Sequence, residues 1–225
     1  MIKDGVNGVD VVRIRPKAFH EAVAAQGWRV LGEGGCAYFP VAGFGAGARF
    51  VGEIAELVAA GGRVPDVDLR PDGVTVRLVT VTEDYYGLTE ADVELARGIS
   101  GVARRLGLVA DPSRVQGVQV TLDALGDGVV PFWRALLGYD QRAGSAEDLI
   151  DPRRRGAQFY FQRMEEPRPQ RNRVHVDLWL PYDQAEARVA AALAAGGRLV
   201  TDEHAPQLWI LADPEGNEAC VGTCG

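Results

Sequence analysis

A pattern of strand, helix and further strands occurs twice in the second half of the 225-residue chain, and this repeat limits the fold more than any single motif does. Alternating apolar and polar positions indicate the strands, and apolar positions three and four apart indicate the helices. The predicted elements are a strand over 118–122, a helix over 130–137, a strand over 158–163, a strand over 173–180, a helix over 182–195, and strands over 198–200, 208–211 and 218–221. Two such units can curl their sheets around one shared cleft.

The first half of the chain has a different element order, which predicts a separate α+β domain. Helix patterns alternate with pairs of strands, so the order is α-β-β-α-β-β-α, with the helices on one antiparallel sheet. The predicted helices cover 17–26, 46–60 and 89–106, and the predicted strands cover 28–31, 37–39, 67–69 and 74–78. Turn residues over 105–114 end the periodic pattern and predict a linker. We therefore expect one domain over 1–108 and a second over 115–225.

Composition is typical of a globular protein and argues against several kinds of partner. Apolar residues make up 47% of the sequence and charged residues 24%, which suffices to fill a core. The net charge of −7 argues against binding a nucleic-acid duplex, which needs clustered lysine and arginine. No apolar run reaches the ~18 residues of a membrane span, and the N-terminus lacks the apolar region of a signal peptide. The sequence therefore predicts a cytoplasmic protein whose partner is a small molecule, with no nucleic acid and no membrane.

Two pieces of the first half, PDVDLRPDGVTVRL at 65–78 and GLTEADVELARGIS at 87–100, resemble pterin-4a-carbinolamine dehydratase. The resemblance covers roughly residues 17–106 and includes the order of the elements. In that family a pair of histidines and a third histidine dehydrate the carbinolamine by acid/base chemistry. The matching positions here are Arg63, Val64 and Val81. Arginine and valine do not serve as acid or base near neutral pH, so we expect no active carbinolamine dehydratase.

The resemblance leaves two interpretations of the first domain. In the first, it is a scaffold or a dimerisation module, and the protein is a homodimer. In the second, the domain retains a pterin-like pocket that has another use. His20 is the only histidine of this half, and it matches none of the family's catalytic positions.

Three pieces of the second half resemble the glyoxalase-like branch of the vicinal oxygen chelate superfamily. They are FWRALLGY at 132–139, NRVHVDLWL at 172–180 and LADPEGNEACV at 211–221. The resemblance covers roughly residues 115–223 and implies two βαβββ modules around a U-shaped cleft, which is the glyoxalase/bleomycin resistance/dioxygenase fold.

The same resemblance implies four positions for a divalent metal. Metal-dependent members use histidine and glutamate there, and the positions fall on Gln119, Gln162, His175 and Cys220. Glutamine is a poor ligand for such ions, and a lone cysteine favours softer metals such as zinc. A divalent metal is therefore possible, but the ligand set is incomplete, and His175 is the ligand if a divalent metal binds.

His175 is the leading candidate for a catalytic side chain, because imidazole exchanges protons near neutral pH. Asp177 shares its strand face and is placed to orient it, and Glu218 is a second carboxylate for proton transfer. The structural alternative for His175 is a core or cleft histidine bonded to the backbone. Cys220 is either a buried structural thiol or a nucleophile activated by His175.

The residues predicted to bind the ligand surround these candidates. Arg173 precedes the histidine strand and is a candidate clamp for a carboxylate, with a surface salt bridge as the alternative. Trp209 would stack on an aromatic ligand if it faces the cleft, and is otherwise part of the core. The predicted ligand-binding set is Gln119, Gln162, Arg173, Trp209 and Cys220.

Two functional hypotheses from different classes follow. The first is an enzyme, a lyase or isomerase that acts by proton transfer on a small organic acid or natural product in the C-terminal cleft. The second is a non-catalytic protein that binds or sequesters a small molecule, with the first domain as scaffold. A pterin-linked role through the first domain is a third hypothesis. The substrate does not follow from the fold, because widely reused folds host many functions.

Overall fold

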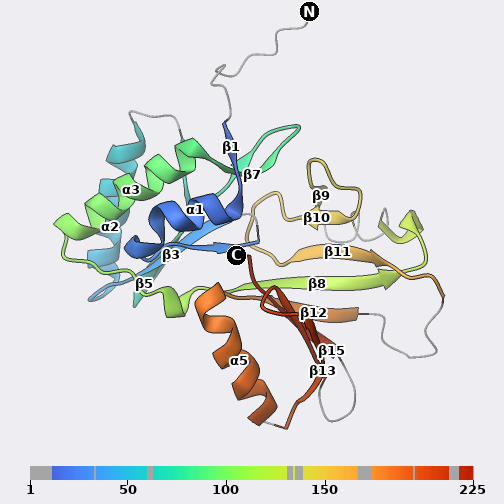
Figure 1. The fold of residues 1–225 in the computed structure, drawn as a ribbon. Helices are drawn as coiled ribbons and strands as arrows, with labels where there is room; N and C mark the ends of the chain where they lie inside the picture. Colours follow the sequence, from blue (N-terminus) through green and yellow to red (C-terminus); the bar gives the residue numbers. More distant parts are fainter. Residues whose placement is uncertain are drawn as a thin grey trace, which may run out of the picture.

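The N-terminal part of the chain places helices on a four-stranded antiparallel sheet with strand order β2-β3-β5-β4 (Figure 1). The computed structural model describes residues 12–32, 34–59, 63–130, 134, 139–166, 174–194, 196–212 and 218–224. The helices are α1 (Pro16–Val23), α2 (Phe44–Ala59) and α3 (Glu90–Arg105), and the strands are β2 (Arg29–Leu31), β3 (Gly34–Pro40), β4 (Asp66–Arg70) and β5 (Gly73–Leu78). This arrangement confirms the predicted α+β class.

The core of this domain follows from the alternation seen in the sequence. Val74, Val76 and Leu78 of β5 are buried, and they face the apolar sides of the three helices. Trp28 is fully buried and its indole N–H donates to the Ser100 hydroxyl at 2.9 Å, which satisfies the polar end of a large core side chain. The predicted helix over 17–26 divides into α1 and a 3-10 turn, Ala24–Gln26, that ends at Gly27 with φ of 86°.

A second, three-stranded sheet in this domain was not predicted. Its strands, in the order β1-β7-β6, are β1 (Arg13–Ile14), β7 (Tyr86–Thr89) and β6 (Thr80–Val81). These strands are too short to show an alternating pattern in the sequence. Strand β7 leads directly into α3 through Thr89, which is the N-cap residue and forms a capping box with Asp92.

The C-terminal part forms one eight-stranded sheet in the order β13-β14-β15-β12-β8-β11-β10-β9. Strands β8 and β12 pair antiparallel at its centre, β11 runs parallel to β8, and β15 runs parallel to β12. The parallel pairing of β11 with β8 is equivalent to the parallel pairing of β15 with β12. This equivalence confirms the predicted paired βαβββ modules. The elements are β8 (Gly117–Ala124), β9 (Asp140–Gln141), β10 (Asp148–Ile150), β11 (Gln158–Arg163), β12 (Val174–Trp179), α5 (Tyr182–Ala194), β13 (Arg198–His204), β14 (Leu208–Ala212) and β15 (Glu218–Gly222).

Parts of the predicted second half lie outside the described residues. Most of the helix expected over 130–137 and all of the turn at 213–217 belong to these parts. Strands β9 and β10 were not predicted, because two or three residues give no usable period. No helix among the described residues combines the length and the apolar composition that crossing a membrane requires.

Contacts between the two parts of the chain are charged and specific. Arg29 of β2 donates to both carboxylate oxygens of Asp183 in α5, at 2.9 and 3.3 Å. Arg154 donates to both oxygens of Asp66 in β4. Near the end of the chain, Cys224 packs against the core of the first domain, and Figure 1 shows the C-terminus beside that domain. The two parts are therefore docked on each other through several segments that lie far apart in sequence.

Candidate functional site

The central strands of the C-terminal sheet bring several of the predicted site residues to one face. Asp177 of β12 pairs with Gln119 of β8 on one side and with Cys220 of β15 on the other. His175 of β12 pairs with Thr121 of β8. Residues directly opposite each other on neighbouring strands project to the same side of a sheet. These five side chains therefore share one face of the sheet, at its centre.

The Asp177 carboxylate is the centre of this cluster. It is 8% exposed, and its Oδ2 accepts hydrogen bonds from the Thr121 hydroxyl at 2.5 Å and from the Gln119 amide at 3.1 Å. Oδ1 is buried and accepts no well-formed hydrogen bond from the described residues. Nε2 of the His175 imidazole lies 3.4 Å from Oδ1. One oxygen is thus held by two donors, and the other is directed toward the histidine.

His175 and Asp177 form the pair that the sequence predicted, with the carboxylate held in place. A buried carboxylate beside an imidazole orients the ring and stabilises its protonated form. The His175 side chain retains 16% exposure, so a ligand on this face can approach it. Thr121 was not predicted, although its position two residues after Gln119 on the same strand was a usable signal.

The Cys220 thiol lies beside the same carboxylate and is poorly suited to attack a substrate. Burial is the largest cause that raises its pKa to about 12, followed by the negative charge of Asp177 and a hydrogen bond to it. A nucleophilic cysteine needs the opposite shift. The structure therefore favours the interpretation of Cys220 as a buried, protonated thiol over that of a nucleophile.

The other predicted residues do not join this hydrogen-bonded cluster. Gln162 of β11 pairs with Asp123, and Glu218 of β15 lies two residues before Cys220, so both share the face of the cluster, but both are exposed. Arg173 lies outside the described residues. Trp209 pairs with Val221 and packs with Leu180, Ala185 and Val189 beneath α5. Its neighbour in the strand, Ile210, is the residue that pairs with Cys220, so Trp209 projects to the opposite face of the sheet from His175. Trp209 is therefore a core residue rather than a platform beside His175.

Three of the clustered side chains could hold a metal ion. The ligand atoms of His175, Asp177 and Cys220 all lie within 4.8 Å of one another. In a tetrahedral zinc site, bonds of 2.0–2.3 Å place neighbouring ligand atoms roughly 3.5 Å apart, which matches the spacing of the histidine and aspartate. The poorly satisfied Asp177 Oδ1 also suits a cation. This set fits zinc, and it differs from the four positions that the family resemblance implied, because Asp177 takes part and neither Gln119 nor Gln162 does.

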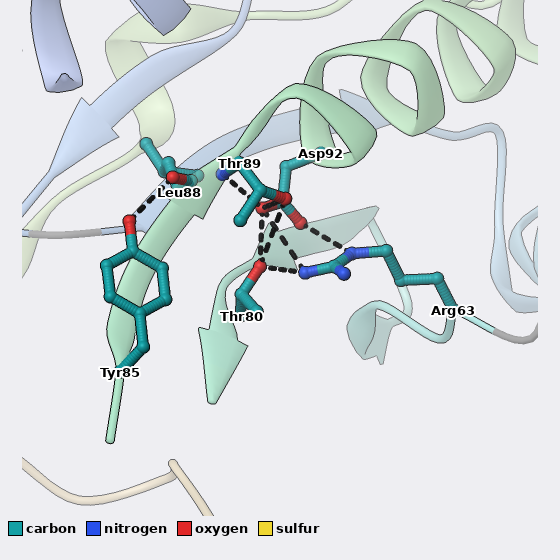
Figure 2. A network of polar contacts seen from close by, with 6 residues as sticks. All are labelled: Arg63, Thr80, Tyr85, Leu88, Thr89 and Asp92. Atoms are coloured by element: carbon teal, nitrogen blue, oxygen red, sulfur yellow. Dashed lines mark hydrogen bonds and ion pairs between the residues drawn. The ribbon is translucent and has the colours of Figure 1, made fainter. Parts of the chain in front are cut away.

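The first domain contains a second polar network, which includes Arg63, the first of the three positions that match the dehydratase histidines (Figure 2). Arg63 donates to Asp92 Oδ1 at 2.9 Å and also to the Thr80 hydroxyl. Asp92 Oδ2 accepts from the Thr80 hydroxyl at 2.7 Å and from the Thr89 backbone and hydroxyl at 2.7 and 2.8 Å. Val81, at the third position, is 45% exposed. The network is satisfied by its own members, which is consistent with a structural role.

A cavity of about 300 Å³ lies between the two domains. Arg77 of β5 and Cys36 of β3 line it from the first domain, and Gln119, Gln158 and Trp179 line it from the second. Gln119 also donates to Asp177, so the cavity adjoins the cluster on the sheet. Arg77 alternates with the buried Val76 and Leu78, so it projects from the other face of β5, and this face meets the second domain.

Comparison with known proteins assigns both halves. Residues 13–102 match the family model for pterin 4 alpha carbinolamine dehydratase, and residues 119–222 match that for a glyoxalase-like domain. A protein of Acidobacterium capsulatum, provisionally named pterin-4-alpha-carbinolamine dehydratase, is 32% identical over 41% of this chain and 99% of its own length. One from Chloroflexus aurantiacus, with the same provisional name, is 42% identical over 28% of this chain and 67% of its own.

Solved structures resemble each half separately. A transcriptional coactivator/pterin dehydratase from Brucella melitensis has 28% identity and a TM-score of 0.36, and the match covers 40% of this chain and 98% of that one. A glyoxalase/bleomycin resistance protein/dioxygenase superfamily member from Vibrio splendidus has 15% identity and a TM-score of 0.32, over 48% of this chain and 99% of that one.

The fold and the family matches define a two-part protein of the α+β class, with helices on an antiparallel sheet followed by paired βαβββ modules. Through its first half, the chain belongs to the pterin-4-alpha-carbinolamine dehydratase family, and its second half is a glyoxalase-like domain. Both resemblances drawn from the sequence are confirmed. The dehydratase match carries Arg63, Val64 and Val81 at the positions discussed above.

Proposed function

We propose that the glyoxalase-like domain binds a small organic molecule over the polar face of its central strands and moves a proton on it with His175. The reaction class that suits such a pair is a lyase or isomerase reaction. The observation that supports this proposal is the fixed Asp177 carboxylate, with Nε2 of His175 3.4 Å from its free oxygen. Asp177 orients the imidazole and stabilises its charge, while the ring takes a proton from the substrate and returns it.

The proposed division of roles uses residues of this chain only. Thr121 and Gln119 position Asp177 by donating to the oxygen that does not face the histidine. His175 is the group that contacts the substrate. The first domain is not proposed to perform dehydratase chemistry, because Arg63 is tied to Asp92 and the other two matching positions are valines.

Substituting His175 tests the proposal directly. Small 2-oxo acids and aromatic acids are first screened for thermal stabilisation of the protein, and the acids that bind are then assayed for turnover. We expect His175→Ala to lower kcat/KM by about a hundredfold to ten-thousandfold, the usual range for loss of a general acid or base, with a small effect on ligand affinity. His204→Ala is the matched control, since His204 is exposed on β13. Unchanged turnover in His175→Ala would eliminate the catalytic role, and binding without turnover in the wild type would favour a sequestering protein.

A zinc-bound form of the same cluster is a second candidate, favoured by the poorly satisfied Oδ1 of Asp177. His175, Asp177 and Cys220 would hold the ion, which when bound supplies a Lewis acid for a substrate oxygen. Under this candidate, zinc raises the melting temperature of the wild type and of Cys36→Ala but not of Cys220→Ala, and binding releases a proton from the thiol. The second candidate is rejected if zinc affects the wild type and Cys220→Ala alike.

A further inference from the structure

The cavity between the domains is lined by Arg77, whose acidic neighbour in the sheet, Asp66, forms an ion pair with a different arginine. Arg77 of β5 pairs across the sheet with Asp66 of β4, so the two side chains lie on the same face. Asp66, however, accepts from Nε and Nη2 of Arg154, a residue of the second domain. Both of its oxygens are used in this way, so Asp66 acts on Arg77 through its charge without a direct ion pair. Among the described residues, Arg77 forms no ion pair within 4.0 Å, and its guanidinium donates to the Tyr86 hydroxyl at 3.0 Å.

The backbone conformation of Arg154 indicates that its ion pair with Asp66 is specific. Arg154 has φ of 54°, in the left-handed region that residues other than glycine rarely adopt. The segment that contains it is anchored by Asp151, which accepts from the backbone amides of Arg153, Arg155 and Gly156. The turn thus presents Arg154 to Asp66 and leaves Arg155 and Gly156 at the cavity wall.

No carboxylate lines the cavity among the described residues, whereas two arginines do. Burial raises the pKa of the Cys36 thiol to about 11, although the charge of Arg77 opposes the shift, so this thiol is neutral at physiological pH. Arg77 is mostly buried, and a bound carboxylate would add a direct ion pair to the hydrogen bond that Arg77 donates to Tyr86.

The remaining walls suit a small organic body attached to such an anion. Leu31, Val118 and Trp179 supply apolar surface, and the amides of Gln119 and Gln158 supply polar contacts. Gln158 is fixed by a 3.1 Å hydrogen bond to the Tyr86 hydroxyl that also accepts from Arg77. The volume of about 300 Å³ is at the small end of the range for ligand pockets.

We propose that this cavity binds the carboxylate of a small organic acid, and that Arg77 of the first domain is the residue that recognises it. The planar guanidinium matches a carboxylate, with Arg155 as a second cation at the rim. The inference rests on the proposed function and names its ligand class, because Gln119 links the cavity wall to Asp177. It also gives the first domain a part in the site, because that domain supplies Arg77.

Binding of sodium benzoate to the full-length protein, measured by isothermal titration calorimetry, tests the proposal. Benzamide is the uncharged counterpart of the same shape, and inorganic phosphate is an anion without an apolar body. We expect benzoate to bind at least tenfold more tightly than either, and Arg77→Gln to weaken benzoate binding by about tenfold to a hundredfold, as expected for loss of a charge-assisted hydrogen bond. Arg70→Gln is the matched control, because Arg70 is an exposed arginine on the neighbouring strand that pairs with Asp68. It should bind benzoate as the wild type does.

Two further variants keep the test decisive. Arg155→Gln changes an exposed residue, so it should fold normally, and we expect it to weaken benzoate binding severalfold even if Arg77→Gln is unstable. His175→Ala should bind benzoate within about threefold of the wild type, because Arg77 and not His175 holds the carboxylate. Equal affinity for benzoate and benzamide, or equal benzoate affinity in Arg77→Gln and Arg70→Gln, overturns the inference and leaves the His175 test of turnover unaffected.

Discussion

Replacing Asp92 with alanine is expected to destabilise the first domain by about 3 kcal/mol, in the range for removing one member of a buried ion pair. The Asp92 side chain is 1% exposed, and it accepts bonds from Arg63, Thr80 and Thr89. Alanine breaks the capping box of α3 and leaves the Arg63 guanidinium, 31% exposed, without its partner. Denaturant unfolding, followed by circular dichroism and tryptophan fluorescence, measures the loss.

Two comparisons identify the cause of that loss. Glu94→Ala, on the exposed side of the same helix, removes only a surface pair with Arg97 and should cost about 0.5 kcal/mol or less. Adding Arg63→Met to Asp92→Ala should recover part of the stability, since it removes the unpaired cation. A loss below about 1 kcal/mol in Asp92→Ala would mean that the network in Figure 2 contributes little to the fold.

The two buried thiols are expected to resist alkylation in the native protein by a factor of at least about a hundred. Burial raises the pKa of Cys36 to about 11 and that of Cys220 to about 12, from an ordinary value of 9.0. At pH 8 only about one thiol in a thousand or fewer is then a thiolate, the form that reacts. The measurement is the iodoacetamide labelling rate of Cys224→Ser, in which only these two cysteines remain, compared with N-acetylcysteine under the same conditions.

The unfolded protein provides the control for this labelling experiment. In guanidinium chloride both cysteines should react at the rate of the free thiol, which shows that folding causes the protection. Because the folded-state pKa values are raised, the native state holds these protons more tightly. The stabilising contribution of the thiols is complete below pH 9 and is lost as the pH rises from about 9 to about 12. Rapid native labelling of Cys220 would restore the nucleophile hypothesis.

Much of the fold could be predicted from the sequence, because it depends on local patterns. Val74, Val76 and Leu78 alternate, and they are buried on one face of β5 as expected. The helix predicted over 89–106 is present as α3, Glu90–Arg105. Strand β11 has the predicted bounds, 158–163. The strands that were missed, such as β6 and β9, have two residues each and therefore no period to detect.

The candidate site was predictable only in part, because strand periodicity gives the face of a residue but not its partner. His175 and Asp177 share a face by their spacing alone. That Gln119 and Cys220 lie on either side of Asp177 depends on the register of β8, β12 and β15. The same register places Trp209 beneath α5, on the opposite face from His175, which the sequence left open.

The sequence by itself determined the two families, the α+β class and the absence of histidine from the dehydratase positions, because these follow from motifs and periods along the chain. Only the tertiary structure decided which charges meet. Asp66 lies opposite Arg77 in its own sheet, yet it pairs with Arg154, a residue 88 positions away in the sequence. Such pairings depend on how the two domains dock, and docking is determined by contacts over long sequence separations that no local pattern encodes.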